Sequence, residues 1–108
     1  MKSLTEEWIA KAESDYASAL REYRARKSPN YDLACFLAQQ CAEKYLKGRL
    51  QEAGVNIEKT HNLVHLLDSC LSHEPFWESL RTSLAVLGNY AVAFRYPGER
   101  ADGEMVRG

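Results

Sequence analysis

The hydrophobic positions of the chain recur at helical spacing in four separate segments. The first segment predicts a helix over about residues 4–25, with Ser3 and Glu6 forming a capping box at its start. The second predicts a helix over about residues 31–53 that stops at Gly54, because glycine commonly ends helices. The expected core stripe of the first helix comprises Trp8, Ile9, Ala12, Tyr16, Ala19, Leu20 and Tyr23.

The third segment predicts a short helix over about residues 61–71, with Thr60 as its N-cap. The fourth predicts a helix over about residues 75–96, which Pro97 terminates. Its expected apolar stripe comprises Phe76, Leu80, Leu84, Leu87, Ala91 and Phe94. No segment alternates as a strand does, so the predicted fold class is all-α, an up-and-down helical bundle of four main helices, one of them short. The segment after Gly98 is too short for a full helix, so a truncated fifth helix remains an alternative.

The second predicted helix differs from the others in how its polar residues are placed. Its first part, YDLACFLAQQC, is apolar almost all round, which is typical of a helix packed on more than one side. Glu43 and Lys47 have the favourable order for an ion pair between residues four apart. A solvated face is one interpretation, and a polar floor in a ligand groove or at a subunit contact is the other. The polar strip consists of Gln39, Gln40, Glu43, Lys44 and Lys47.

Composition narrows the class of protein. With 108 residues, 45% hydrophobic and 27% charged, the chain is predicted to form a single domain over residues 1–108. A net charge of -1 gives no global attraction to nucleic acid or membrane, so nucleic-acid contacts would need a local patch. No apolar run approaches the roughly 20 residues that cross a bilayer, and the N-terminal stretch is acidic, so a cytoplasmic protein without membrane partners is expected. Three cysteines, an odd number, fit a reducing compartment.

The histidines and cysteines are the candidates for metal binding and for nucleophilic catalysis. A zinc-like spacing, H-x3-H-x4-C-x2-H, is formed by His61, His65, Cys70 and His73. Position 62 is asparagine, however, where a zinc hydrolase of the H-E-x-x-H type needs a glutamate base. The alternative interpretation is that His61 caps or hydrogen-bonds at a helix start while His65 faces solvent. Cys35 and Cys41 are predicted to be inert core thiols, and no glycine-rich phosphate loop is present. We therefore predict no metal and no cofactor.

The end of the fourth helix offers a cation instead. Because Pro97 stops the helix, Arg95 is predicted to lie in its last turn, where the helix dipole favours positive charge. Together with a lysine of the second helix, an arginine there offers a phosphate a bidentate clamp and a point charge. The predicted ligand-binding residues are Arg95, Tyr96, Lys44, Lys47 and Gln40.

Three stretches, ACFLAQQCAEKYLKGRL, KTHNLVHLL and FRYPGE, occur in an order and at spacings that resemble the HEPN domain, a small helical family of prokaryotes and higher eukaryotes. The opening WIAKAESDYASA is similar to the family's first helix, so the resemblance spans residues 8–99. The resemblance implies an up-and-down helical bundle, usually a homodimer. Many members are ribonucleases, often toxins, in which an arginine ending a long helix is followed a few residues later by a histidine.

The resemblance carries the family arginine to Arg95 but leaves its histidine without a match. Arg100, Ala101 and Asp102 stand at the corresponding spacings, and no histidine follows His73. Moving the 2′-hydroxyl proton of RNA near neutral pH needs a group such as histidine, whereas arginine stays protonated. The chain therefore resembles the shorter, non-catalytic members, which are often encoded beside a minimal nucleotidyltransferase and are thought to bind nucleotide or to serve as its partner subunit.

We accordingly predict a module that binds a nucleotide or an RNA phosphate, or docks a nucleotidyltransferase, as part of a toxin–antitoxin-type pair. One alternative is a metal-independent ribonuclease with a degenerate arginine–histidine motif, in which Arg95 acts and Glu99 or His61 serves as base. Another is a purely structural dimerisation domain, in which Arg95 neutralises a helix end or pairs with Asp15 or Glu43. A homodimer is expected in all three cases, because the second helix has more apolar surface than four helices easily cover.

Overall fold

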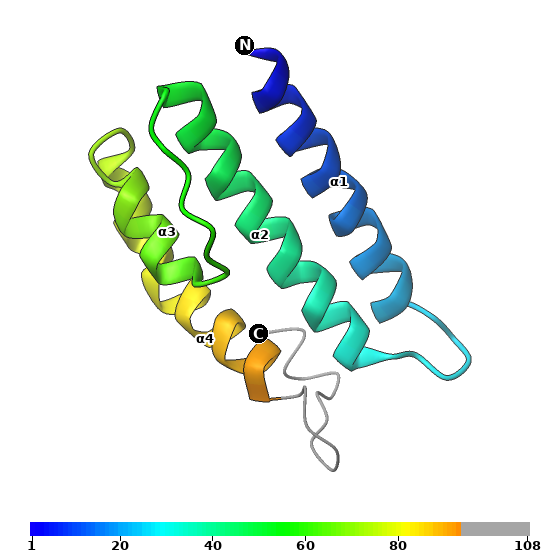
Figure 1. The fold of residues 1–108 in the computed structure, drawn as a ribbon. Helices are drawn as coiled ribbons and strands as arrows, with labels where there is room; N and C mark the ends of the chain where they lie inside the picture. The colour runs from blue at the N-terminus through cyan, green and yellow to red at the C-terminus, as the bar shows by residue number, and fades with distance from the viewer. Residues whose placement is uncertain (94–108) are drawn as a thin grey trace.

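The computed structural model describes the backbone of residues 1–93 and the side chains of residues 1–90. Four α-helices and one 3-10 helix make up this part of the chain, which contains no strand. Figure 1 shows the two longest helices lying antiparallel, with the shorter ones on the opposite side of the second. The elements are α1 (Ser3–Tyr23), α2 (Tyr31–Ala53), α3 (Leu63–Cys70), η1 (Pro75–Leu80) and α4 (Arg81–Ala93). The all-α helical bundle predicted from the sequence is confirmed.

Helix α2 is the central element, since it packs against α1 on one side and against α3 and α4 on the other. This arrangement fits the first part of α2, which is apolar almost all round, although Leu33 and Phe36 there remain exposed. Its boundaries agree with the prediction, because Asn30 caps its start by accepting from Leu33 N and Gly54 ends it at φ 73°. The main core is formed by Leu46, Leu50, Leu63, Leu66 and Cys70.

The start of α1 corrects the predicted capping box. Ser3 is already the first helical residue, Lys2 is the N-cap, and no side chain caps the helix. Instead, Glu52 near the end of α2 accepts hydrogen bonds from Lys2 N and from Thr5 Oγ1, both at 3.0 Å. A carboxylate from the neighbouring helix therefore accepts from the backbone N–H of the N-cap residue, as the glutamate of a capping box would. The helix ends at Tyr23 rather than at residue 25.

The third and fourth predicted helices also need correction. Helix α3 begins at Leu63, and its N-cap is Asn62, whose Oδ1 accepts from His65 N. Thr60 is not the cap, although its hydroxyl accepts from Asn62 N just before the helix. The helix ends at Cys70 instead of residue 71.

The fourth segment begins at Pro75 as predicted but runs as a 3-10 helix before α4. A 3-10 helix has three residues per turn, so the expected stripe loses its register there. Phe76 is accordingly 91% exposed and Leu80 is also exposed, while Trp77 packs against the core with Leu84 and Leu87. The predicted end of this helix, residues 94–96, lies outside the described residues.

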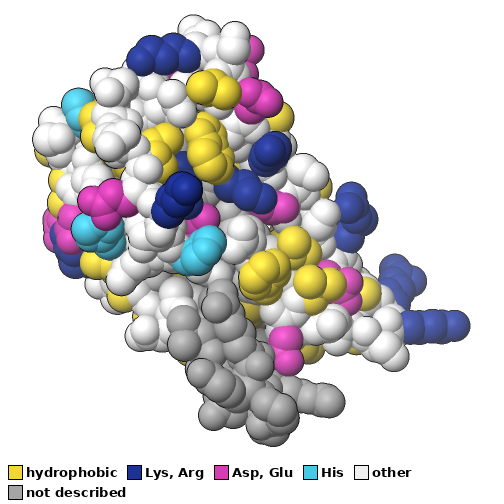
Figure 2. All heavy atoms as spheres, viewed as in Figure 1, with side chains coloured by type: hydrophobic (Ala, Val, Ile, Leu, Met, Phe, Trp, Pro, Cys, Tyr) yellow, Lys and Arg dark blue, Asp and Glu magenta, His cyan; other side chains and the backbone are white. Residues whose placement is uncertain are grey.

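The connection between α2 and α3, residues 54–62, runs back along α2 and so brings its last residues beside the middle of that helix (Figure 1). We call this segment the connecting loop. Ile57 packs against the core from within it. No helix within residues 1–93 is long and apolar enough to cross a membrane. Figure 2 shows acidic and basic side chains interspersed on the face that it presents.

Candidate functional site

The polar strip of α2 is partly buried, which contradicts the solvated-face interpretation for three of its members. Gln39 is 3% exposed, Glu43 4% and Lys47 8%. A charged or amide side chain is rarely buried this deeply unless it has partners, because leaving water is costly. These residues and His61 of the connecting loop form what we call the Glu43 cluster.

Glu43 is the centre of this cluster, and both of its carboxylate oxygens have partners. Lys47 Nζ donates to Oε2 at 3.0 Å, which forms the predicted pair between residues four apart. His61 Nδ1 lies 2.8 Å from Oε1. Lys47 Nζ also stands 5.9 Å from the ring centroid of Trp8 on α1, within the range of a cation–π interaction. The Glu43 carboxylate thus joins the connecting loop to α2, and Lys47 joins the cluster to α1.

His61 is held by two buried side chains but keeps its ring accessible. Its backbone oxygen accepts from Gln39 Nε2 at 3.2 Å, and its ring is oriented through Nδ1 by Glu43. The side chain is nevertheless 71% exposed, and among the described residues Nε2 has no partner. A carboxylate that binds one ring nitrogen fixes the orientation of the imidazole and leaves the other nitrogen for a ligand.

A polar pocket of about 380 Å³ opens beside this histidine. It lies between the middle of α2, the start of α3 and α4, and we call it the polar pocket. Gln39 lines it, and the Oε1 atom of this residue is buried without a hydrogen-bond partner among residues that the structure describes. Such atoms are uncommon in native proteins and call for an explanation. The lining residues are Gln39, His61, Asn62, Leu63, Val64, Leu84, Ala85, Gly88 and Asn89.

The residues predicted to bind a ligand are not gathered in one place by the described structure. Lys44 Nζ pairs with Asp15 on α1 at 2.5 Å, and Lys47 is engaged within the Glu43 cluster. Gln40 is half-buried on α2. Arg95 and Tyr96 lie outside the described residues, so their predicted role stays a prediction. The two carboxylates considered as partners for Arg95, Asp15 and Glu43, already pair with other cations.

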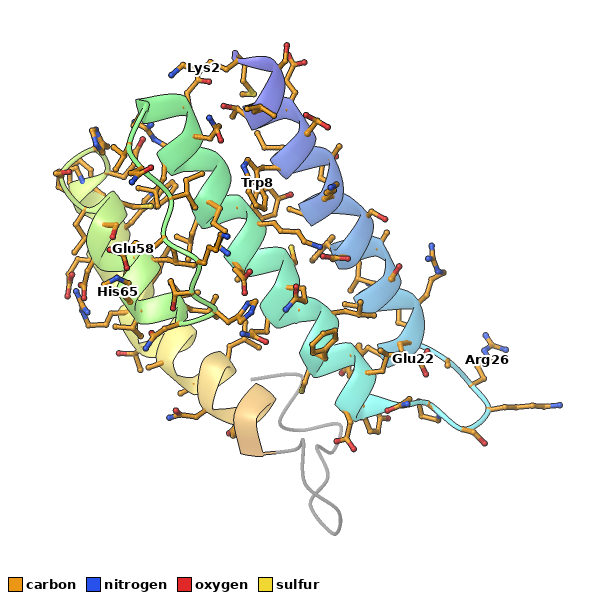
Figure 3. All side chains as sticks on the ribbon, viewed as in Figure 1. Lys2, Trp8, Glu22, Arg26, Glu58 and His65 are labelled. Atoms are coloured by element: carbon orange, nitrogen blue, oxygen red, sulfur yellow. The ribbon has the colours of Figure 1, made fainter. Side chains whose placement is uncertain are left out.

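The zinc-like spacing does not bring its members together. His61 contacts Glu43, whereas His65 contacts Glu58 at 2.7 Å on the outer side of the connecting loop, as Figure 3 shows. Cys70 is fully buried in the core. Within residues 1–93 no three histidine, cysteine or acidic side chains are placed to hold a metal ion.

The three cysteines are buried, and none of them forms a disulfide. Burial raises the pKa of the thiols of Cys35, Cys41 and Cys70, so less of each is present as the reactive thiolate. This agrees with the prediction that Cys35 and Cys41 are core thiols. We assign them no part in the candidate site.

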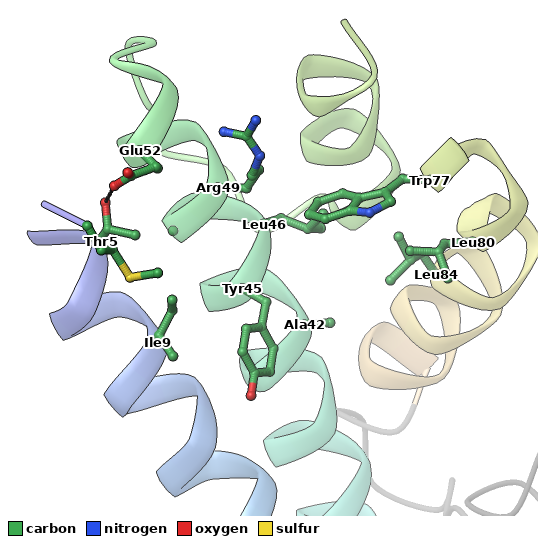
Figure 4. Close-up of a pocket in the computed structure, with 12 residues that line it drawn as sticks. Thr5, Ile9, Ala42, Tyr45, Leu46, Arg49, Glu52, Trp77, Leu80 and Leu84 are labelled. Carbon is green, nitrogen blue, oxygen red and sulfur yellow. Dashed lines mark hydrogen bonds between the residues drawn. The ribbon is translucent and has the colours of Figure 1, made fainter. Parts of the chain in front are cut away.

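A second hollow, an apolar groove of about 510 Å³, lies between the N-terminal half of α1, α2 and the η1–α4 segment. Figure 4 shows Ile9, Leu46, Trp77 and Leu84 among the side chains around it. Tyr45 and Leu80 also line this groove and remain exposed. The groove is a place where apolar surface is left uncovered by α1 and α4, as the apolar pattern of α2 led us to expect.

Sequence reasoning identified the polar strip but did not join it to His61. Residues 43 and 61 are separated by a helix end and a loop, and no spacing rule connects them. The available signal was Asn62, since an asparagine before an apolar run is a typical N-cap and would have placed His61 just outside the helix.

Comparison with known proteins agrees with this architecture. A family model described as HEPN domain matches residues 5–107, which is nearly the whole chain. No curated protein and no solved structure gave a significant match. The resemblance seen in the sequence is therefore confirmed, and with it a relation to nucleotide- and RNA-associated modules. The chain belongs to the HEPN domain family.

Proposed function

We propose that the protein is a binding module for a nucleotide or an RNA phosphate, and that the polar pocket is where the ligand is held. The observation that carries this proposal is the fixed, exposed imidazole of His61 at the edge of a pocket of about 380 Å³. Pockets of this size accommodate small ligands, and a few placed polar groups among apolar walls give orientation. The buried Glu43–Lys47 pair acts as the support that fixes His61.

Arg95 is the proposed phosphate contact, with Tyr96, Lys44, Lys47 and Gln40 as the further predicted contacts. Gly88 and Asn89 of α4 line the polar pocket, and Arg95 follows them six positions after Asn89 in the sequence. An arginine binds phosphate through two parallel hydrogen bonds and is always charged. Lys44 and Lys47 each pair with a carboxylate in the ligand-free protein, so a phosphate would have to compete for them.

The test is binding of a fluorescein-labelled single-stranded RNA and of ATP to wild-type protein and to Arg95→Ala. We expect Arg95→Ala to lower the affinity for RNA or for ATP by tenfold or more, since a charge-assisted contact contributes about 1.5–3 kcal/mol. Arg26→Ala is the matched control, because Arg26 is exposed in the connection between α1 and α2 (Figure 3) and does not line the pocket. If Arg95→Ala leaves RNA, nucleotide and partner binding all unchanged, the proposal is wrong.

Partners form a further part of the proposal. We propose that the protein forms a homodimer and docks a minimal nucleotidyltransferase as half of a toxin–antitoxin-type pair. The uncovered apolar groove supports association with another protein surface. Purification together with the products of neighbouring genes, followed by mass spectrometry and a measurement of molar mass, tests both statements. A protein that stays monomeric and alone at micromolar concentration would contradict them.

A ribonuclease is the second candidate, and the Glu43–His61 contact is the observation that favours it. An imidazole oriented by a carboxylate is a suitable general base. His61 Nε2 would take the 2′-hydroxyl proton as the 2′-oxygen attacks phosphorus; the bond to the 5′-oxygen breaks, and that oxygen gains a proton from water. Cleavage of a model RNA that is lost in both His61→Ala and Arg95→Ala would support this function. Intact RNA after incubation with the wild-type protein would exclude it for that substrate.

A further inference from the structure

The polar pocket combines apolar walls with neutral hydrogen-bonding groups. Leu63, Val64, Leu84 and Ala85 supply the apolar surface. Gln39, Asn62 and Asn89 supply amides, and no lysine, arginine, aspartate or glutamate lines the pocket among the described residues. A phosphate needs cations or several donors, so it does not suit this interior. A neutral planar ring with hydrogen-bonding groups at its edge suits this interior better.

The amide of Gln39 leaves one specific hydrogen bond to be made. Its Nε2 donates to His61 O at 3.2 Å, and this contact assigns the other atom as the oxygen. Oε1 accepts from none of the described residues although the side chain is almost fully buried. A buried acceptor without a donor is unfavourable, and a ligand N–H that reaches it directly or through one water recovers that loss.

Asn62 supplies the opposite polarity on the same pocket. Its Oδ1 is occupied, because it accepts from His65 N at 3.0 Å as the N-cap of α3. The donor group Nδ2 is therefore the part of this amide left for a ligand. An acceptor at Gln39 and a donor at Asn62 match a ring edge that carries an N–H beside an acceptor, which is the pattern of nucleobases.

We infer that the polar pocket is a nucleobase site, in which the Gln39 oxygen accepts an N–H of the base and the apolar walls contact its faces. This inference rests on the proposed function, since it names the part of the ligand that the pocket reads. The pocket then holds the base, and the phosphate stays assigned to the predicted contact with Arg95. Specificity comes from a ligand donor that satisfies a protein acceptor already buried.

The first experiment compares AMP with purine riboside 5′-monophosphate, which differs from AMP only by lacking the 6-amino donor. Wild-type protein should bind AMP about tenfold more tightly, as expected for a buried acceptor left unsatisfied by the analogue. Gln39→Met keeps an unbranched side chain of similar length without the amide, and should bind the two compounds equally. Equal binding by wild type, or preserved discrimination in Gln39→Met, would overturn the inference.

A second variant tests the pocket without altering Gln39. A Cβ at Gly88 meets nothing within 4 Å, and leucine is a better helix former than glycine, so Gly88→Leu should fold well while its side chain fills the space beside the pocket. AMP affinity should fall by tenfold or more. Val86→Leu is the matched control, because Val86 is exposed on the same helix and does not line the pocket. Unchanged AMP binding in a folded Gly88→Leu protein would count against a base in this pocket.

Ribose 5-phosphate and a labelled single-stranded RNA separate this inference from the proposed function. If these bind and their binding weakens in Arg95→Ala, while AMP shows no advantage over purine riboside 5′-monophosphate, the base site is wrong and the phosphate site stands. If RNA, AMP and ribose 5-phosphate all fail to bind, both are wrong. Thermal unfolding and far-UV circular dichroism of each variant establish that the loss is not a loss of fold.

Discussion

Replacing Glu43 by glutamine tests how much the stability of the fold depends on pairing the buried charge of Lys47. Lys47 and Glu43 have side chains only 9% and 5% exposed, and their charged atoms are 3.0 Å apart. At an effective dielectric constant of about 20, that separation corresponds to an attraction of roughly 5–6 kcal/mol, much of which offsets the cost of removing both charges from water. Glu43→Gln keeps the shape but leaves the Lys47 charge unpaired. We expect the free energy of unfolding to fall by about 3 kcal/mol.

The assay is a double-mutant cycle by urea denaturation with Glu43→Gln, Lys47→Met and the double variant, all at one protein concentration because association would shift apparent stability. The double variant should be less destabilised than the sum of the single variants by about 2 kcal/mol, since it leaves no buried charge without a partner. The control cycle uses Asp15→Asn and Lys44→Met, whose side chains are 19% and 22% exposed. There we expect a coupling of about 1 kcal/mol or less.

The result that would refute the reasoning is additivity. If the Glu43–Lys47 coupling is below about 0.5 kcal/mol, or no larger than that of the control pair, the burial of this pair has no energetic consequence beyond that of a surface pair. An equal slope of stability against urea for all variants is needed for the comparison, because a changed slope signals a change in the unfolded state.

Two further predictions concern the contact between α1 and α2. Gly48→Ala should lower the free energy of unfolding by about 1–3 kcal/mol despite the better helix propensity of alanine, because the added Cβ would lie 3.2 Å from Trp8 Cβ. Urea denaturation measures this change, and a stabilised variant would contradict the prediction. Hydrogen bonds from Lys2 N and Thr5 Oγ1 hold the pKa of Glu52 below its ordinary value of 4.5. The ionised carboxylate therefore stabilises the fold fully above pH 4.5, and this stabilisation is lost as the pH falls through the lower pKa of the folded state. Glu52→Gln should therefore be less stable than wild type at neutral pH and converge with it in acid, as thermal unfolding against pH will show; a constant difference at all pH values would count against this origin.

Local signals were sufficient for α2. Its two ends carry side-chain and backbone features that act within a few residues, namely the Asn30 cap and the left-handed Gly54, and its apolar pattern correctly indicated neighbours on more than one side. The ion pair between Glu43 and Lys47 was predictable for the same reason, because four residues along a helix bring two side chains together.

What the sequence did not predict depends on contacts between distant segments or on a change of helix type. Glu52, near the end of another helix, accepts from the N–H of the N-cap residue of α1 in place of the predicted Glu6. His61 meets Glu43 only because the connecting loop folds back along α2. Phe76 is exposed because three residues per turn, instead of 3.6, move it away from the core line that Leu84 and Leu87 follow.

The return of the connecting loop along α2 has a consequence for how the pocket opens. His61 and Asn62 end this loop, and they also form one wall of the polar pocket. Any local opening that lifts this wall must break the His61–Glu43 contact and the Gln39 hydrogen bond together. If the proposed ligand binds in this pocket, its binding is linked to closure of the loop. It should then slow amide hydrogen exchange throughout the loop and at the start of α3, well beyond the atoms that it touches.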